Sequence, residues 1–445
     1  MKCTQLLLIF LCTCSLTSLA QSDYTLVMDR IREDELSAAG NITTLDNNVT
    51  TTLGSLNTNG SWPDISYTYS STTYQAATHI NRVKSFALAY SHTSSSYYHS
   101  DTLFDAITRS LDYWDTRDPI SWNWWHNEIS NPKAIGKILI ILETAPDTLP
   151  STLRSNLLSQ MNRGNPSVQT GTNKLDVAIH FIYRACLTAN ATLMNTGVSE
   201  AFQPIVITTG DGIQPDLSFQ QHGPQFYLYG YGDEFVKGEV DVAYYLRGTA
   251  WALSGSKHEL FSNFMRKAFL KVLRYKYTDF STCGRGISRP GNLNRANTGP
   301  IKKWMELDTA YTAEYEAIRA RHLGYQPPSY MVEPFHSHFW HSDYSVHQRP
   351  GYFFGLRNVS TRTAKSEYGN GENLKGYYLT EGANAIVIEG NEYRNIFPVW
   401  DWAKIPGTTL PQKTTIPKPT QWEKPGNAIF AGGVSNGNYG VTTYQ

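Results

Sequence analysis

The sequence predicts an α+β protein in which a long helical region is followed by a smaller antiparallel β-region. Two patterns support this prediction. Between about residues 76 and 322, apolar side chains recur three and four positions apart, and Gly, Pro, Asn or Asp bounds each run, as in amphipathic helices. Beyond residue 334, short alternating segments separated by Gly and Asn replace the helical pattern, which is typical of antiparallel strands.

The first 20 residues have the pattern of a secretory signal peptide. A short basic start is followed by the apolar run LLLIFLCTCSL and by a small-residue exit at Ala20. Leu11 precedes Cys12 where a lipoprotein would carry a small residue, so a lipid anchor is not expected. Because no later stretch is long and apolar enough to span a bilayer, we expect an exported protein, secreted or periplasmic in a bacterium, without membrane attachment after cleavage.

The helical domain is placed at residues 21–325. Its first helix is predicted at residues 23–38, and the Thr-, Asn- and Ser-rich stretch over roughly residues 40–75 is expected to be a loop or an extended connection. Further helices are predicted at residues 101–114, 131–145, 151–162, 173–187, 240–253, 257–275 and 307–323. No short motif repeats, but about ten similar helices in series indicate helical hairpins around a common axis.

The change of pattern falls at GYQPPSYMVEP, residues 324–334, and the β-domain is placed at residues 335–445. Strands are predicted in the segments GYFFGLRNVS, KGYYLT and ANAIVIEG. This region is short and ends in loop-like sequence, so we expect a small or incomplete sheet and a chain that is truncated within it.

The amino-acid composition narrows the classes of function that the protein could have. Charged residues make up 17% of the chain and their formal net charge is zero, which argues against a nucleic-acid binder that relies on bulk charge. The 28 Tyr and 11 Trp suit a protein that stacks on carbohydrate, but they suit a well-filled core equally. Three of the five cysteines lie in the signal segment; the remaining Cys186 and Cys283 could pair, and neither belongs to a metal-like cluster.

The candidates for chemistry are polar residues in aromatic, glycine-rich loops, since the chain has no phosphate loop, no H-E-x-x-H and no nucleophile elbow. NWWHNEISNP, residues 123–132, places Trp124 and Trp125 either in a core or on a platform for a sugar ring. TGTNKLD, residues 170–176, places Asn173 where a helix begins, either as an ordinary end residue or beside N–H groups suited to holding a carboxylate.

The loop at residues 211–232 places His222 nine residues before Tyr231, in a stretch too rich in Gly and Pro to be one helix. Either residue could be structural or functional. Asp211 and Asp216 of the same loop could form the acid pair of a hydrolase, but we interpret them as turn and helix-cap residues.

Two more loops contribute charged side chains. CGRGISRP, residues 283–290, carries Arg285 and Arg289, whose planar guanidinium groups suit a carboxylate or sulfate, or else belong to a solvated surface loop. Glu367 and Asn370 lie in RTAKSEYGNGEN, where they are either turn residues or reach back to the helical domain.

Taken together and in this order, these stretches resemble polysaccharide lyase family 8, and in particular its bacterial chondroitin AC lyases. The resemblance runs from about residue 120 to 410. The matching stretches are NWWHNEISNP, TGTNKLD, DLSFQQH, YGYG, GRGISR, PFHSHFWHSDYSVHQRPGYFFGLR, NGENLKGYY and NEYRNIFPVWDWAKIPGTT.

The resemblance implies an (α/α) toroid followed by an antiparallel β-sandwich domain. It also implies β-elimination in chondroitin, chondroitin sulfate or hyaluronan, with unsaturated uronate products. Carried over by motif position, the catalytic residues would be Asn173, His222, Tyr231, Arg285 and Glu367, and the substrate-binding residues Trp124, Trp125, Arg289 and Asn370. The expected partner is an acidic polysaccharide bound by a monomer. No cofactor is expected in catalysis, although a structural divalent cation stays an open alternative.

Two rival functions stay open. One is a glycoside hydrolase on a similar helical toroid, with Asp211 or Asp216 in a carboxylate pair. The other is a non-catalytic glycan-binding protein, which would retain a polymer without shortening it.

Overall fold

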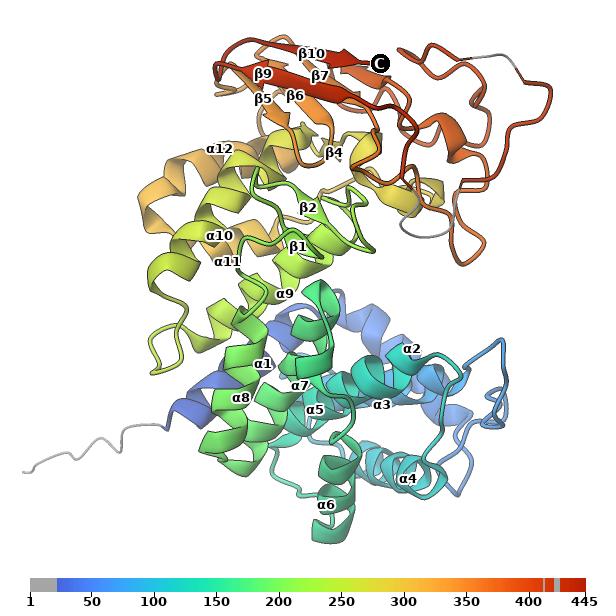
Figure 1. Ribbon diagram of the computed structural model, residues 1–445. Helices are drawn as coiled ribbons and strands as arrows, with labels where there is room; N and C mark the ends of the chain where they lie inside the picture. The colour runs from blue at the N-terminus through green and yellow to red at the C-terminus, as the bar shows by residue number, and fades with distance from the viewer. Residues whose placement is uncertain (1–21, 411–412, 420–424) are drawn as a thin grey trace, which may run out of the picture.

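The computed structural model describes residues 22–410, 413–419 and 425–445, and it shows a helical part followed by antiparallel sheets (Figure 1). This confirms the predicted fold class; the predicted signal peptide lies outside the described residues. The α-helices are α1 Asp23–Ser37, α2 Ile42–Gly54, α3 Ala76–Ser91, α4 Asp101–Arg117, α5 Asn131–Leu142, α6 Ser151–Gln160, α7 Gly171–Thr188, α8 Ala191–Phe202, α9 Tyr231–Leu246, α10 Gly255–Lys267, α11 Gly299–Met305 and α12 Thr312–His322.

The helices are arranged as hairpins around an inner set. Helices α3, α5, α7 and α9 pack against one another in chain order, and α1 packs against α5, α7 and α9. The intervening helices pack on this set, with α4 against α3 and α8 against α7. The inner helix α5 follows a short π-helical turn, His126–Ser130, and is apolar around most of its circumference because neighbours surround it.

Helix α2 corrects the loop predicted over residues 40–75. Asn41 caps it by accepting a hydrogen bond from the Thr44 N–H at 2.9 Å, and Leu45 and Val49 are buried on its inner side. Its threonine hydroxyls, such as that of Thr50 with the Asp46 carbonyl at 2.8 Å, donate to carbonyls one turn back. With this bonding, the threonine-rich segment is helical although its composition predicts a loop.

Other elements also differ from the predictions. The segment KGYYLT forms a 3₁₀ turn, Gly376–Tyr378, instead of a strand, because the place beside β7 is taken by β8. The helix predicted at residues 257–275 ends at Lys267, and a 3₁₀ turn and a short hairpin follow it. The helix predicted at residues 240–253 spans Tyr231–Leu246, so it begins at the end of the Gly- and Pro-rich stretch 211–232.

The strands form one four-stranded antiparallel sheet in the order β5-β6-β7-β8 and three two-stranded sheets, β1-β2, β3-β4 and β9-β10. The strands are β1 Gly212–Ile213, β2 Phe219–Gln220, β3 Leu273–Arg274, β4 Tyr277–Thr278, β5 Phe335–Phe339, β6 Tyr344–Arg349, β7 Tyr352–Arg357, β8 Ala383–Val387, β9 Ala431–Ser435 and β10 Gly440–Tyr444. Strands β9 and β10 pack on β5 (Figure 1). His336 Nδ1 of β5 lies 2.9 Å from the hydroxyl of Ser435 in β9. The small sheets β1-β2 and β3-β4 were not predicted, and the β9-β10 hairpin corrects the loop-like end expected for the β-region.

Polar and aromatic contacts join the helical part to the sheets. Arg274 donates to the carbonyls of Ile388 and Pro350, each at 2.7 Å. Phe280, from the loops after α10, packs its ring against Tyr393 and Trp400, with ring centroids 5.0 and 5.3 Å apart. The loops of the sheet domain are thereby held against the helix ends that carry the candidate site.

The predictions about the two cysteines and about membrane-spanning segments can also be compared with the structure. Cys186 and Cys283 are both buried and unpaired, so the disulfide that the sequence left open is not formed. Within the described ranges, no helix combines the length and the apolar character needed to cross a membrane.

Glu239 of α9 offers a test of the core. Its side chain is fully buried, and among the described residues neither carboxyl oxygen has a hydrogen-bond partner. Burial raises its pKa well above the ordinary 4.5, with Lys257 opposing the shift. Replacing Glu239 with Met should raise the free energy of unfolding at neutral pH by about 1–3 kcal/mol, since a buried polar group without a partner is lost.

The gain from Glu239→Met should also depend on pH. A carboxyl group with a raised folded-state pKa costs stability above its unfolded pKa, near 4.5, and the cost grows until the pH passes the folded pKa. Urea denaturation at pH 5 and pH 8 measures this, and the gain should be larger at pH 8. An equal gain at both values would contradict a raised pKa for Glu239.

Candidate active site

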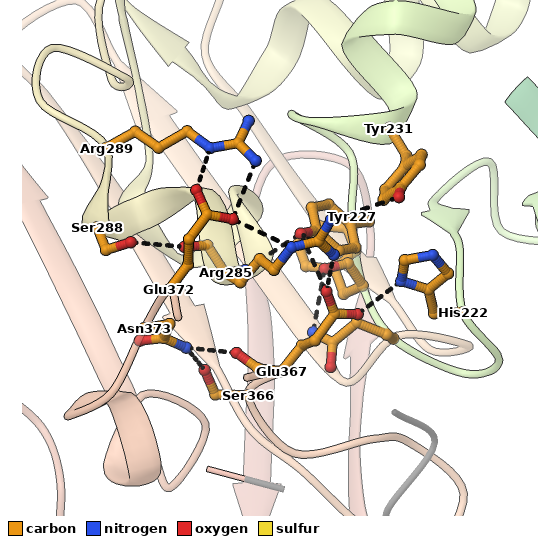
Figure 2. A network of polar contacts seen from close by, with 12 residues as sticks. His222, Tyr227, Tyr231, Arg285, Ser288, Arg289, Ser366, Glu367, Glu372 and Asn373 are labelled. Carbon is orange, nitrogen blue, oxygen red and sulfur yellow. Dashed lines mark hydrogen bonds and ion pairs between the residues drawn. The ribbon is translucent and has the colours of Figure 1, made fainter. Parts of the chain in front are cut away.

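A cleft of about 510 Å³ lies where the N-terminal ends of α7 and α9 meet the loop that follows β4. Five of the residues selected from the sequence line it: Trp125, Asn173, Tyr231, Arg285 and Arg289. His222 and Glu367 lie next to this set and contact its members (Figure 2). The structure thus brings together residues spread over more than half of the chain.

The backbone places Asn173 and Tyr231 at neighbouring helix ends. Asn173 is in the first turn of α7, and the hydroxyl of Thr172 donates to the carbonyl of Tyr231 at 2.9 Å. Tyr231 begins α9 directly after Gly230, which has φ 116° and a Cβ position only 2.6 Å from the Tyr227 ring, so a side chain at residue 230 is excluded. The N–H groups of both helix starts make this end of the cleft favourable for negative charge.

Glu367 connects His222 with Arg285 (Figure 2). One carboxylate oxygen lies 2.8 Å from His222 Nδ1, the other forms an ion pair with Arg285 Nη1, and the Glu367 side chain is 1% exposed. The carboxylate accepts from Nδ1–H and so fixes the orientation of the His222 ring. His222 has φ 63°, a conformation that costs free energy for a residue with a side chain and is found often at functional sites.

Two tyrosines lie beside Arg285, and their surroundings separate their roles. Tyr227 is buried, its hydroxyl accepts from the Arg285 N–H at 3.2 Å, and Glu367 Oε1 lies 3.4 Å from it. Burial first and the Glu367 charge second raise the pKa of Tyr227 well above 10, so it stays protonated. Tyr231 is only partly buried, and its hydroxyl lies 3.5 Å from Arg285 Nη2. Tyr231 is therefore the tyrosine placed to exchange a proton with a ligand.

The two arginines share a second carboxylate. Glu372 accepts from Arg289 Nε at 2.5 Å and Nη2 at 3.0 Å, and from Arg285 Nε at 3.2 Å. Burial opposes the charge of Arg285, but Tyr227, Tyr231 and Glu367 outweigh burial and raise its pKa. The hydrogen bond to Glu372 raises the pKa of Arg289. Both guanidinium groups stay cationic and present positive charge at one wall of the cleft.

Tyr227 and Glu372 are the members of this network that sequence reasoning missed. Tyr227 lies in the same loop as His222, but it is one of 28 tyrosines and only its burial distinguishes it. Glu372 directly follows the Asn-Gly pair of the NGEN motif, a signal of a tight turn that could have indicated a fixed side chain.

Trp124 and Asn370 are both exposed and lie outside the set of residues that line the cleft. Asp211 accepts from Gln221 Nε2 at 2.8 Å and from the Gly223 N–H at 3.0 Å. Asp216 accepts from the Ser218 N–H at 2.9 Å and from the His341 N–H at 2.5 Å. The two aspartates hold loops in place, as a turn role predicts, and neither lines the cleft.

Other carboxylates do line the cleft, and each has a cationic partner. Asp176 forms an ion pair with Lys133 at 2.6 Å, and Asp233 forms one with Arg295 at 2.9 Å. In the part of the chain that the structure describes, no group of three or more His, Cys, Asp or Glu side chains is arranged to hold a metal ion. Beside these ion pairs, the cleft and its edge present the Tyr231 hydroxyl, the Asn173 amide, the His222 imidazole and the guanidinium groups of Arg285 and Arg289.

Comparison with known proteins identifies the family of both parts of the chain. Residues 25–319 match polysaccharide lyase family 8, N terminal alpha-helical domain, and residues 334–445 match polysaccharide lyase family 8, super-sandwich domain. A Chondroitinase-AC from Pedobacter heparinus is 41% identical over 88% of this chain, and the chain spans 57% of the length of that relative.

Two other relatives and one solved structure extend the comparison. A xanthan lyase from Bacillus sp. is 26% identical over 74% of this chain and 40% of its own length. The hyaluronate lyase HylB from Enterococcus faecalis is 25% identical over 82% of this chain and 42% of its own length. A solved chondroitinase AC lyase superposes with a TM-score of 0.91 and 39% identity, covering 95% of this chain and 63% of that one. The chain therefore belongs to polysaccharide lyase family 8.

Proposed function

We propose that this protein is a lyase that cleaves uronic-acid-containing glycosaminoglycans by β-elimination. The observation that carries the proposal is the meeting of the Tyr231 hydroxyl with Arg285 in a cleft that Asn173 also lines, with His222 beside Tyr231. Chondroitin or chondroitin sulfate is the first proposed substrate, since the relative with 41% identity is a Chondroitinase-AC. Hyaluronan is the second, in view of the hyaluronate lyase relative.

The first requirement of the reaction is to offset the charge of the uronate carboxylate. The proton on C5 of the sugar is a very weak acid while the neighbouring carboxylate stays fully charged. The Asn173 amide N–H and the Nε2–H of His222 would donate hydrogen bonds to this carboxylate and stabilise the additional charge that develops on it as C5 loses its proton. Glu367 would orient the imidazole through the 2.8 Å contact with Nδ1.

The second requirement is proton transfer. The Tyr231 oxygen would take the C5 proton, and the nearby Arg285 guanidinium would stabilise negative charge on that oxygen. The C5 electron pair forms the C4–C5 double bond as the bond from C4 to the O4 oxygen breaks. Tyr231 then gives its proton to the leaving oxygen, so the products are an unsaturated uronate and a new hydroxyl end. Protons and electrons balance without a metal or a co-reactant.

The arginines also explain how a chain of zero formal net charge would bind a polyanion. Arg285 and Arg289 line the cleft with positive charge. An anionic group bound there would lie within a Debye length of them, about 8 Å at physiological ionic strength, so salt would screen the attraction only in part. We therefore propose an acidic polysaccharide as the partner of a monomeric enzyme, active without added cofactor. Full activity in the presence of a chelator would agree with catalysis that needs no added metal ion.

We further propose that the protein acts outside the cytoplasm after removal of residues 1–20. N-terminal sequencing of the protein recovered from the periplasm or the medium tests this. A first residue at or near Gln21 is expected, whereas an intact start at Met1 would contradict export by cleavage.

One assay separates the proposed lyase from its rivals. The purified protein is incubated with chondroitin, chondroitin sulfate and hyaluronan while ultraviolet absorbance and chain length are followed together. A lyase shortens the polymer and creates an absorbing unsaturated uronate. A hydrolase shortens it without absorbance, and a binding protein retains it intact; either of these results would reject the proposal.

Trp125 tests the sugar platform. It lines the cleft, and its side chain is 40% exposed, so a sugar ring has an aromatic face to stack on. Trp125→Ala should raise KM about tenfold with a smaller change in kcat, since stacking acts on bound substrate and transition state alike. Trp122→Ala is the matched control, because Trp122 is 50% exposed in the same loop but does not line the cleft. Equal effects of the two substitutions would contradict the platform.

A further inference from the structure

Glu372 contacts two arginines that line the cleft, Arg285 and Arg289, and the proposed reaction does not yet use it. Its two carboxylate oxygens contact the guanidinium groups of Arg285 and Arg289, which project from the helical part of the chain (Figure 2). The contacts to Arg289 involve Nε and Nη2, so one whole edge of that guanidinium group is engaged. The charges of the two arginines lower the pKa of Glu372 despite partial burial, which keeps it ionised.

The loop backbone fixes where Glu372 points. Asn370 and Gly371 have φ values of 52° and 76°, and the Glu372 N–H donates to the Gly369 carbonyl at 2.8 Å, which closes a tight turn. Asn373 Nδ2 then bonds to the Glu367 carbonyl at 2.7 Å. One loop of the sheet domain therefore carries both carboxylates, Glu372 in the turn and Glu367 just before it, and both reach the arginines of the helical part.

The two arginines depend on Glu372 to different degrees. Arg285 is 7% exposed and is also bound by Glu367 and Tyr227. Arg289 is 55% exposed, and its side-chain partner within the described residues is Glu372. A long, half-exposed arginine samples many rotamers, and a bidentate carboxylate is the kind of contact that selects one. Loss of Glu372 should therefore release Arg289 and leave Arg285 in place.

We infer that Glu372 is a positioning residue of the proposed lyase, which fixes Arg289 on the cleft wall so that its unengaged Nη1 edge meets an anionic group of the polysaccharide. This inference rests on the proposed function. Guanidinium groups carry five donors, so an arginine bound at Nε and Nη2 still offers Nη1 to a sulfate or carboxylate. Glu372 acts through Arg289 and makes no contact with the reacting atoms in the proposed mechanism.

The experiment compares steady-state kinetics on chondroitin sulfate for the wild type, Glu372→Gln and Glu372→Asp. Glu372→Gln should raise KM about tenfold with kcat changed less than about twofold, because a binding contact is lost while Tyr231 and Arg285 stay in place. Glu372→Asp, which keeps the charge on a shorter side chain, should recover part of the loss. Glu314→Gln is the control: Glu314 bridges Arg266 and Lys271 at 32% exposure, away from the cleft, and its loss should leave KM unchanged.

A double-mutant cycle shows whether Glu372 acts through Arg289. In an Arg289→Gln background, Glu372→Gln should change KM by less than about twofold. Additive effects would overturn the inference, and so would a fall in KM on Glu372→Gln, which would mean that Glu372 only competes with the substrate for Arg289.

Binding measured without turnover separates this inference from the proposed function. Calorimetric titration of a chondroitin sulfate oligosaccharide should show about tenfold weaker binding for Glu372→Gln than for the wild type, both carrying Tyr231→Phe. If the wild type cleaves nothing but this difference is present, the lyase proposal fails and the role of Glu372 stands. If the wild type cleaves the polymer and this difference in binding is absent, the lyase proposal stands and the role of Glu372 is overturned. A protein that neither binds nor cleaves the polymer overturns both.

Discussion

Tyr231→Phe should lower kcat on the preferred glycosaminoglycan by about 10³-fold, within the range that general acid–base catalysis contributes. The substitution removes one oxygen, which in the proposed mechanism accepts the C5 proton and then protonates the leaving oxygen. The ring stays. Its centroid lies 4.6 Å from that of the His222 ring and 5.7 Å from Arg285 Cζ, and both contacts should persist. Substrate binding should therefore be nearly unchanged. Initial rates of ultraviolet absorbance and calorimetric affinity for an oligosaccharide give the two quantities separately.

Tyr227→Phe is the informative companion to this variant. Its hydroxyl contacts Arg285 and Glu367 in the interior, and its raised pKa keeps it protonated, so its loss should disturb the arrangement without removing a proton carrier. We expect a fall in kcat at least tenfold smaller than for Tyr231→Phe. If Tyr231→Phe keeps most of the wild-type rate, or Tyr227→Phe is the more damaged variant, the assignment of the base is wrong.

Local sequence pattern was sufficient for the fold class and for most helices. The run NPKAIGKILIIL has apolar spacing and a proline in its first turn, and it forms α5. TGTNKLD was placed at a helix start, and α7 begins at Gly171. The errors arise where tertiary contacts override composition. Threonine-rich α2 is helical because Leu45 and Val49 are buried, and KGYYLT is not a strand because β8 occupies the adjacent place in the sheet.

The candidate site was harder to derive, because its members are distant in sequence. Arg285 and Glu367 are 82 residues apart, and nothing in either motif shows that they meet. Their selection came from the family resemblance, and the structure supplies the geometry that the resemblance lacked. The choice between Tyr227 and Tyr231 depends on burial, which no local pattern reports, and the role of Glu372 depends on a turn that directs one side chain across to another domain.

Glu367 is the position where loss of one group should damage both stability and catalysis. Its carboxylate is 1% exposed and joins Arg285 to His222. Glu367→Ala would leave the Arg285 guanidinium buried beside Glu372, which reaches it at Nε at 3.2 Å but not at the Nη1 that Glu367 binds. Breaking a buried ion pair in this way costs about 3–5 kcal/mol, and we expect a loss of stability near the lower end because Glu372 compensates in part.

The effect on catalysis should exceed what instability alone explains. Without Glu367, His222 loses the contact that orients its ring, and Arg285 loses the ion pair that holds it beside Tyr231, so kcat should fall by about 10²–10³-fold in the fraction that stays folded. Glu381→Ala is the control, because Glu381 forms an ion pair with Lys365 in which each side chain is only 10% exposed, and neither residue lines the cleft. It should lower the urea midpoint while leaving kcat within about twofold of the wild type. If the Glu367 and Glu381 variants lost stability equally and both kept their kcat, the Glu367 carboxylate would be a structural pair and the proposed orientation of His222 would have to come from another group.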